Sequence, residues 1–264
     1  MSFNEKWLEA VRIKNSLLCV NIDPAEWGQR ENGTIGQNID KVAWTIELIE
    51  SVAPYAAAIK PNRQYFKDVS RQDMKKINDV IHKHQMLSID DSKIADIGDT
   101  NDAALYHAVE EGFDAVTYAP FPGNIEATCK MAQKRGIGLI PLVLMSNPEY
   151  KLMKQAQING IPAYKYIAQE VKQHGADGIV IGAPSEKNHI TLDEIACVRE
   201  IVGHKTVLVP GIGAQGGDLK PIIDAFGDYT ITSVGRAIAY ADKPQEKAQE
   251  YHELIQAALS LIHI

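Results

Sequence analysis

The chain has 264 residues, of which 45% are hydrophobic and 23% charged, a composition typical of an ordinary soluble protein large enough for one barrel or two smaller domains. The net charge of −7 argues against nonspecific nucleic-acid binding, and no apolar run approaches the ~20 residues that span a bilayer. No basic region precedes an apolar core at the start, so no signal peptide is expected. Cys19, Cys129 and Cys197 are odd in number and far apart, which indicates buried thiols in a reducing cytoplasm.

Short β-type runs alternate with amphipathic helical patterns along the chain. The β-type runs lack polar alternation, as expected for parallel strands covered on both faces. We expect strands at 17–23, 56–61, 86–90, 115–119, 138–145, 178–181, 206–210 and 230–234. We expect helices at 38–52, 71–84, 101–111, 123–135, 162–174, 191–202, 217–226 and 244–260. Ser70 and Thr191 stand where two of these helices would be capped.

Eight β/α units in a chain of this length predict an α/β fold, a (β/α)8 TIM barrel in which residues 1–264 form a single domain. An open doubly wound sheet would normally carry G-x-G-x-x-G after the first strand, where this chain has Ile22-Asp23-Pro24. The polar stretch 24–37 is expected to form a long loop at the barrel mouth, the end where the strands' carboxyl ends meet.

Ionic and polar residues follow several of the expected strands. In a barrel these strand ends converge on one site, so their coincidence is a site hypothesis. Asp91 and Lys93 lie two apart and would project to the same side, and Asp96 can curl back from the following turn. Taken alone, this D-x-K-x-x-D pattern fits a strand-end salt bridge equally well. The residues at these ends are Asp23, Lys60, Asp91, Lys93, Ser146, the stretch 211–217, Gly235 and Arg236.

The last two barrel units resemble an anion cradle. The stretch 210–217 (PGIGAQGG) follows one expected strand and opens a helix, and Gly235-Arg236 ends the next strand. Glycines let backbone N–H groups approach an oxygen-rich ligand, a helix N-terminus favours negative charge, and an arginine supplies a paired donor. The pattern therefore predicts a phosphate site, although tight βα turns alone would also explain the glycines.

The ordered set of motifs resembles the orotidine 5′-phosphate decarboxylase family over almost the whole chain, from Asp23 to Arg236. The matching segments are Ile59-Lys60-Pro61-Asn62, the D-x-K-x-x-D-I-G-x-T run at 91–100, Met145-Ser146, Ala183-Pro184-Ser185, Pro210-Gly211-Ile212-Gly213-Ala214-Gln215 and Val234-Gly235-Arg236. The chain departs from many relatives at Glu186-Lys187-Asn188, where they place a Thr-Arg pair.

The resemblance implies decarboxylation of orotidine 5′-phosphate to UMP and CO2, the last step of de novo pyrimidine biosynthesis, without metal or cofactor. Lys60, Asp91, Lys93 and Asp96 would form the catalytic charge network, with Lys93 protonating the carbanion at C6. The resemblance also implies a homodimer in which Asp96 and Thr100 reach into the neighbouring subunit's site. The implied substrate contacts are Asp23, Lys60, Thr100, Ser146, Pro184, Gln215, Gly235 and Arg236.

Three alternatives stay open from the sequence. A Mg²⁺-dependent phosphosugar enzyme of the same barrel group would need a carboxylate near the second strand, where this chain has Lys60. A Schiff-base aldolase would need an unprotonated lysine, but Lys60 and Lys93 stand near carboxylates. A barrel that only binds nucleotides would have no evident need for so many buried charges. The histidines show no metal-binding spacing.

Overall fold

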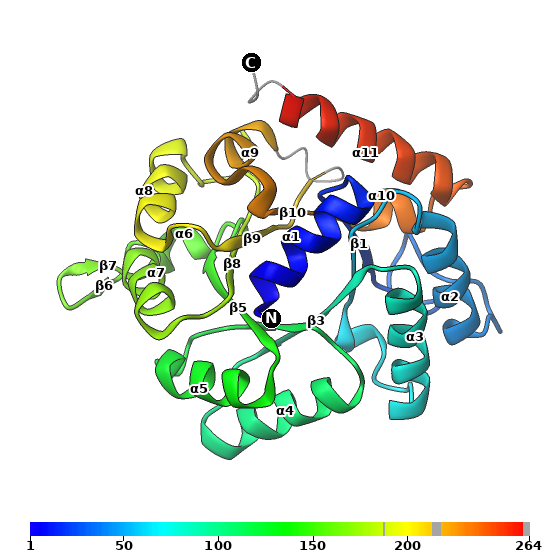
Figure 1. Ribbon diagram of the computed structural model, residues 1–264, viewed down its shortest axis with the longest axis horizontal. Coiled ribbons are helices and arrows are strands. Elements are labelled where there is room, and N and C mark those ends of the chain that lie inside the picture. Colours follow the sequence, from blue (N-terminus) through cyan, green and yellow to red (C-terminus); the bar gives the residue numbers. More distant parts are fainter. Residues whose placement is uncertain (187, 213–217, 261–264) are drawn as a thin grey trace.

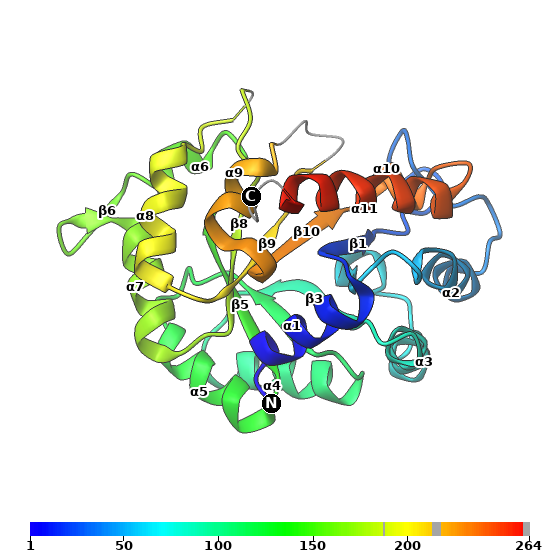
Figure 2. The same cartoon turned by 45° about the horizontal axis from the view of Figure 1, so that its top comes forward.

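The computed structural model describes residues 1–186, 188–212 and 218–260, which form a closed parallel barrel surrounded by helices (Figures 1 and 2). The strand order around the barrel is β1-β10-β9-β8-β5-β4-β3-β2. This arrangement confirms the predicted (β/α)8 TIM barrel. The strands are β1 (Leu18–Ile22), β2 (Ala58–Pro61), β3 (Leu87–Ile94), β4 (Ala115–Tyr118), β5 (Gly138–Leu144), β8 (Gly178–Ile181), β9 (Thr206–Val209) and β10 (Thr230–Val234).

The expected helices are all present, and the caps read from the sequence are confirmed. The Ser70 hydroxyl accepts the N–H of Asp73, and the Thr191 hydroxyl accepts the N–H of Glu194. The expected start of one helix at 217 lies outside the described residues. The helices are α2 (Lys41–Val52), α3 (Arg71–Lys83), α4 (Gly98–Glu110), α5 (Ile125–Arg135), α7 (Ala163–His174), α8 (Leu192–Val202), α9 (Lys220–Phe226) and α11 (Pro244–Ser260).

Several elements were not predicted. Two are short helices and two are short 3-10 turns: α6 (Tyr150–Met153), α10 (Arg236–Ala239), η1 (Arg63–Tyr65) and η2 (Gly227–Tyr229). A small hairpin pairs β6 (Gln157–Ile158) with β7 (Ile161–Pro162) outside the barrel. The largest addition is α1 (Phe3–Lys14), which crosses one end of the barrel in Figure 1.

Helix α1 closes the barrel at the amino ends of its strands. Trp7 is fully buried, and its ring N–H donates to the carbonyl of Asp228 at 2.8 Å. Position 138 must be glycine because a Cβ there would lie 2.6 Å from the Cβ of Phe3. Helix α1 therefore covers this end of the barrel, and the opposite end is the mouth.

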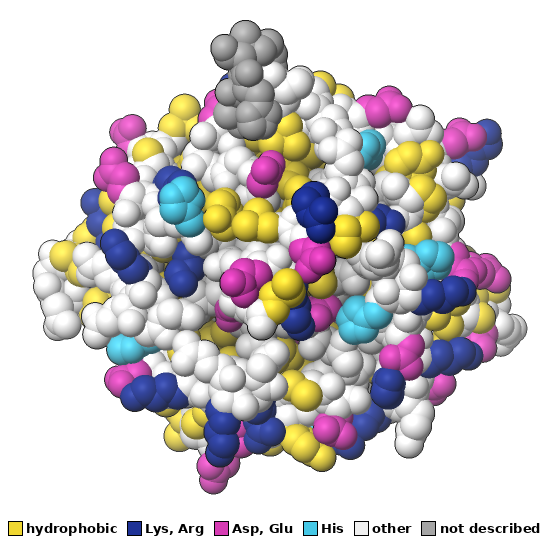
Figure 3. Space-filling view, viewed as in Figure 1, with side chains coloured by type: hydrophobic (Ala, Val, Ile, Leu, Met, Phe, Trp, Pro, Cys, Tyr) yellow, Lys and Arg dark blue, Asp and Glu magenta, His cyan; other side chains and the backbone are white. Residues whose placement is uncertain are grey.

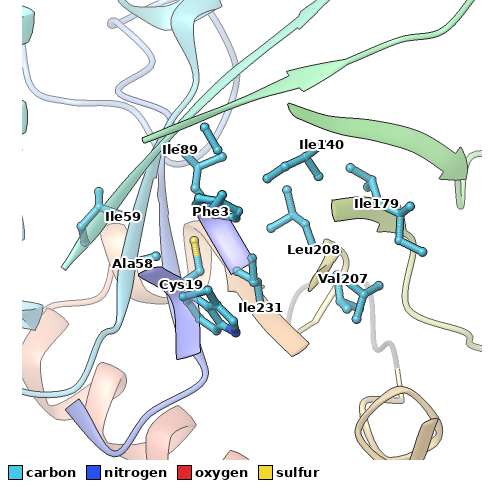
Figure 4. Packing of buried hydrophobic residues seen from close by; sticks show 14 of the residues in the cluster. Phe3, Cys19, Ala58, Ile59, Ile89, Ile140, Ile179, Val207, Leu208 and Ile231 are labelled. Atoms are coloured by element: carbon cyan, nitrogen blue, oxygen red, sulfur yellow. The ribbon is translucent and has the colours of Figure 1, made fainter. Parts of the chain in front are cut away.

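Apolar side chains fill the lower part of the barrel. Figure 4 shows Phe3 lying among Cys19, Ile89, Ile140 and Ile231, which come from four different strands. All are at most 3% exposed, so the barrel interior is a packed core rather than a channel. This core supports the strands between the end covered by α1 and the mouth.

The outer surface beside α1 is mixed in charge. Figure 3 shows Lys and Arg side chains interspersed with Asp and Glu over this face. Among the described residues, no helix is both long and apolar enough to cross a membrane. Cys19 and Cys129 are buried, Cys197 is half-buried, and all three are free thiols.

Candidate active site

Strand β3 positions Asp91 and Lys93 by extending beyond its expected end at residue 90. The pairing of β3 with β4 shifts register between Asp90 and Ile94, which marks a bulge. Lys93 lies within this bulge. Its φ of +50° is in the left-handed region, which residues other than glycine rarely adopt. No residue pattern predicted this bulge, which redirects the Lys93 side chain at the mouth.

Asp91 lies between two ammonium groups. Lys60 Nζ contacts Asp91 Oδ2, and Lys93 Nζ lies 2.5 Å from Asp91 Oδ1. Lys60 and Asp91 are buried, whereas the side chain of Lys93 is 46% exposed. Asp91 and Lys93 thus project to the same side, as predicted. Lys93 is the member of this trio that is open to a ligand.

Neighbouring charges keep Lys60 and Asp91 ionised. Burial opposes ionisation of both Lys60 and Asp91. Lys60 and Lys93 nevertheless hold the pKa of Asp91 well below its ordinary value. Asp91 and Asp23 together keep the pKa of Lys60 above its ordinary value. Lys60 therefore stays protonated at neutral pH and is a poor nucleophile.

Thr117 of β4 contacts both Asp91 and Lys93. Its Oγ1 accepts the backbone N–H of Lys93 at 3.0 Å and lies 3.2 Å from Asp91 Oδ1. Thr117 was missed by sequence reasoning. The signal available was a threonine within the short strand Ala115–Tyr118, which lies next to the strand that carries the D-x-K pattern.

Asp23 lies just after β1, where the loop that follows is firmly anchored. The Tyr240 hydroxyl donates to the Asp23 carbonyl at 2.7 Å, and Arg30 donates to the same oxygen at 3.2 Å. The Arg30 guanidinium also lies over the rings of Tyr65 and Tyr240. The structure thereby fixes the backbone of Asp23 beside the Lys60–Asp91 pair.

Ser146 and Pro184 lie after β5 and β8 at the same mouth. A Cβ at Gly182 would lie 2.7 Å from the Cβ of Ser146, so glycine permits the two segments to meet. Pro184 is buried, and its carbonyl accepts the N–H of Asp218 at 2.8 Å. These contacts place both residues on the wall of the mouth.

The predicted phosphate residues are only partly described. Gln215 lies outside the described residues. Gly235 directly follows β10, and a Cβ there would lie 3.2 Å from the Cβ of Asn21. Arg236 begins α10, is exposed, and forms no ion pair with any described residue. Its guanidinium is therefore available to an anionic ligand.

Asp96 and Thr100 lie on the outer rim of the mouth and are both exposed. The Asp96 carboxylate accepts the N–H of Ile97 at 2.8 Å. It forms no ion pair with the cations of 1–186, 188–212 or 218–260, so within one chain it does not join Lys60, Asp91 and Lys93.

Asp90 faces the opposite side of β3 from Asp91. It is almost fully buried, and its Oδ1 has no hydrogen-bond partner among the described residues. Burial raises the pKa of Asp90 to about 7, although Arg63 nearby opposes this. Arg63 is already paired with Glu111 at 3.0 Å. Asp90 is therefore a buried acid that is neutral below pH 7.

Asp90→Asn is expected to stabilise the protein at pH 8 but not at pH 4. The raised pKa means that Asp90 binds its proton more tightly in the folded protein than in the unfolded chain. The free energy of unfolding therefore falls as pH rises from about 4 to about 7, by up to roughly 4 kcal/mol. Asparagine stays neutral and escapes this loss. Urea unfolding of both proteins between pH 4 and 8 measures the difference.

The matched control is Asp114→Asn, because the pKa of Asp114 is lowered beside His82 and Lys6. Asp114→Asn should therefore lower the free energy of unfolding at pH 8, whereas Asp90→Asn should raise it. A stability difference for Asp90→Asn that does not vary with pH would contradict the buried-acid assignment.

Among the described residues, no three His, Cys, Asp or Glu side chains come together as a metal site. The expectation that no metal or cofactor is needed stays a prediction.

Comparison with known proteins places the chain among decarboxylases. The model of the Orotidine 5′-phosphate decarboxylase / HUMPS family matches residues 16–251. The chain is 32% identical over 262 residues to an orotidine 5′-phosphate decarboxylase of Cupriavidus metallidurans, covering 94% of this chain and 93% of that relative. It is similar to the solved structure of Leishmania donovani OMP decarboxylase, with TM-score 0.80, 26% identity, and coverage of 98% and 99%. L. donovani UMP synthase gives TM-score 0.81 at 27% identity, with 98% of this chain covering 57% of that protein.

Proposed function

We propose that this chain, which belongs to the orotidine 5′-phosphate decarboxylase / HUMPS family, converts orotidine 5′-phosphate to UMP and CO2. The observation that carries the proposal is the Lys60–Asp91–Lys93 trio at the mouth of the barrel, with Lys93 open to a ligand. The reaction would serve pyrimidine biosynthesis, with residues 1–264 acting as one catalytic domain. The three free cysteines fit a reducing cytoplasm.

The chemistry requires a fixed cation and a proton at one place. Loss of CO2 from C6 of the orotate ring leaves a carbanion in the ring plane, which the π system cannot delocalise. Lys93 supplies positive charge where this carbanion forms and then donates a proton to it. Asp91 holds the Lys93 ammonium through a contact of 2.5 Å, and Lys60 holds Asp91 from the other side. The site is thus ordered before substrate arrives.

Asp23, Ser146 and Pro184 are proposed to contact the ribose and pyrimidine, because they line the mouth beside the trio. Gly235 and Arg236 are proposed to bind the phosphate together with Gln215. Binding energy from the remote phosphate can then serve positioning at the reacting ring.

Arg236→Ala is expected to weaken UMP binding by roughly 2–4 kcal/mol, about 30- to 1000-fold, because a charge-assisted contact to phosphate is lost. Calorimetric titration with UMP measures this effect. Uridine, which lacks the phosphate, should bind the variant and the parent equally well.

Arg12→Ala is the matched control, since Arg12 is exposed on α1 at the closed end of the barrel. Unchanged UMP affinity in Arg236→Ala would remove Arg236 from the phosphate site.

A homodimer with shared sites is also proposed. Asp96 and Thr100 are exposed on the rim, and Ile97 between them is 64% exposed. Phe121, on the loop after β4, is 87% exposed. The Asn124 amide donates to the Asp96 carbonyl at 3.1 Å, which joins the two loops. Asp96 forms no ion pair within the part of the chain that the structure describes. An apolar rim around this carboxylate supports the burial of this edge against a second copy, with Asp96 completing that copy's charge set.

The structure does not favour the alternative functions. Lys60 occupies the end of β2, where it would repel a divalent cation, and its raised pKa disfavours Schiff-base chemistry. The decisive test is the absorbance change as orotidine 5′-phosphate becomes UMP, with EDTA present. Metal-independent turnover supports the proposal. No turnover by a folded protein would overturn it in favour of a nucleotide-binding barrel or a Mg²⁺ enzyme.

A further inference from the structure

We propose that Thr117 is a positioning residue that sets the place of the Lys93 ammonium. This inference rests on the proposed decarboxylase function, but one of its tests does not. Thr117 lies on β4, the strand next to β3, which carries Asp91 and Lys93. Its exposed fraction is 1%. None of the proposed substrate contacts involves it.

The first argument is the backbone of Lys93. The bulge between Asp90 and Ile94 takes the Lys93 N–H out of the β3–β4 ladder. The conformation at φ +50° persists only where the surroundings hold it, because it is unfavourable for a lysine. The acceptor that replaces the ladder is Thr117 Oγ1, at 3.0 Å from the Lys93 nitrogen.

The second argument is the hydroxyl hydrogen of Thr117. Two acceptors lie within reach, the carbonyl of Asp90 at 3.3 Å and the Asp91 carboxylate at 3.2 Å. A hydrogen bond to an ionised carboxylate is the stronger of the two, so the hydroxyl is directed to Asp91 Oδ1. The same oxygen of Asp91 contacts Lys93 Nζ.

One hydroxyl therefore fixes both ends of the catalytic lysine. It holds the backbone of Lys93 by accepting its N–H, and it orients the carboxylate that holds the ammonium. Since a displacement of about 1 Å costs roughly 10²-fold in rate, the removal of this hydroxyl should act on kcat.

The test compares Thr117→Val, which keeps the branched shape, with Thr117→Ser, which keeps the hydroxyl. Thr117→Val is expected to lower kcat roughly 10- to 100-fold, with KM and UMP affinity within about threefold of the parent. Thr117→Ser should retain most of the activity. Thr117→Ala removes the same hydroxyl and serves if the valine variant does not fold.

Thr232→Val is the matched control. Thr232 is also a buried strand threonine, on β10, but its hydroxyl has no partner among the described residues. This variant should keep the parent kcat. Equal losses in Thr117→Val and Thr232→Val, or a loss shared by Thr117→Ser, would show that Thr117 only stabilises the barrel, and would overturn the proposal.

Amide hydrogen exchange at Lys93, followed by NMR without ligand, tests the geometry independently of activity. The amide should exchange at least about tenfold faster in Thr117→Val, because its acceptor is lost. Absence of turnover in the parent protein would overturn the proposed function, and exchange would still test the contact. Unchanged exchange, or unchanged kcat in an active enzyme, would overturn the role of Thr117.

Discussion

Lys93→Ala is expected to lower kcat by at least about 10⁴-fold while UMP affinity changes only a few-fold. Lys93 is proposed to act twice, as the cation beside the developing carbanion and as the proton donor. General acids contribute about 10²–10⁴-fold and preorganised charges about 10²–10³-fold. UMP has no carboxylate at C6, so the lysine matters less for its binding. A turnover assay measures kcat, and calorimetric titration measures UMP affinity.

Lys93→Arg separates the two roles of the lysine. Arginine keeps the positive charge but does not release a proton at neutral pH. It should therefore also lose most of the turnover if proton donation is essential. The buried pair Lys60–Asp91 remains in both variants, so the fold should be retained. Near-normal kcat in Lys93→Ala would remove Lys93 as proton donor.

The barrel was predictable because both faces of its strands are covered. Apolar runs such as 138–145 contain too few polar residues to be loops, and eight of them alternate with amphipathic segments. Asp91 and Lys93 were predictable as neighbours because residues two apart share one side of a strand. In the structure Lys93 Nζ lies 2.5 Å from Asp91 Oδ1, although this contact forms across a bulge that the spacing alone did not predict.

Two missed elements carried signals in the sequence. Ser2 caps the start of helix α1 and forms a reciprocal capping box with Glu5 in its first turn. The β6–β7 hairpin turns at Asn159-Gly160, both with positive φ, the pair most typical of a tight hairpin. Its strands are only two residues long, so no alternation of polar and apolar residues flanks the turn.

Other features depend on long-range packing and had no local signal. The bulge at Lys93 arises from the register of β3 against β4. The adjacent carboxylates Asp90 and Asp91 face opposite sides of β3. Burial raises the pKa of Asp90, whereas two lysines lower the pKa of Asp91. Neither outcome can be read from two consecutive aspartates.

Mixing Lys93→Ala subunits with Asp96→Ala subunits is expected to restore activity that neither variant has alone. In the proposed dimer, Asp96 of one subunit completes the site that contains Lys93 of the other. A mixed dimer then holds one intact site and one site that lacks both groups. With random exchange, half the dimers are mixed, so activity should recover to about a quarter of the parent value.

The recovery should follow subunit exchange in time and should saturate at equal amounts of the two variants. A mixture of Lys93→Ala with Asp91→Ala is the control, because both changes affect groups of the same chain that lie in contact. Each site in that mixed dimer lacks one of the two groups, so no recovery is expected. If mixed dimers form and Lys93→Ala with Asp96→Ala stays inactive, Asp96 does not act across the interface. Its position on the exposed rim, away from the trio of its own chain, would then mark it as part of the rim rather than of the site.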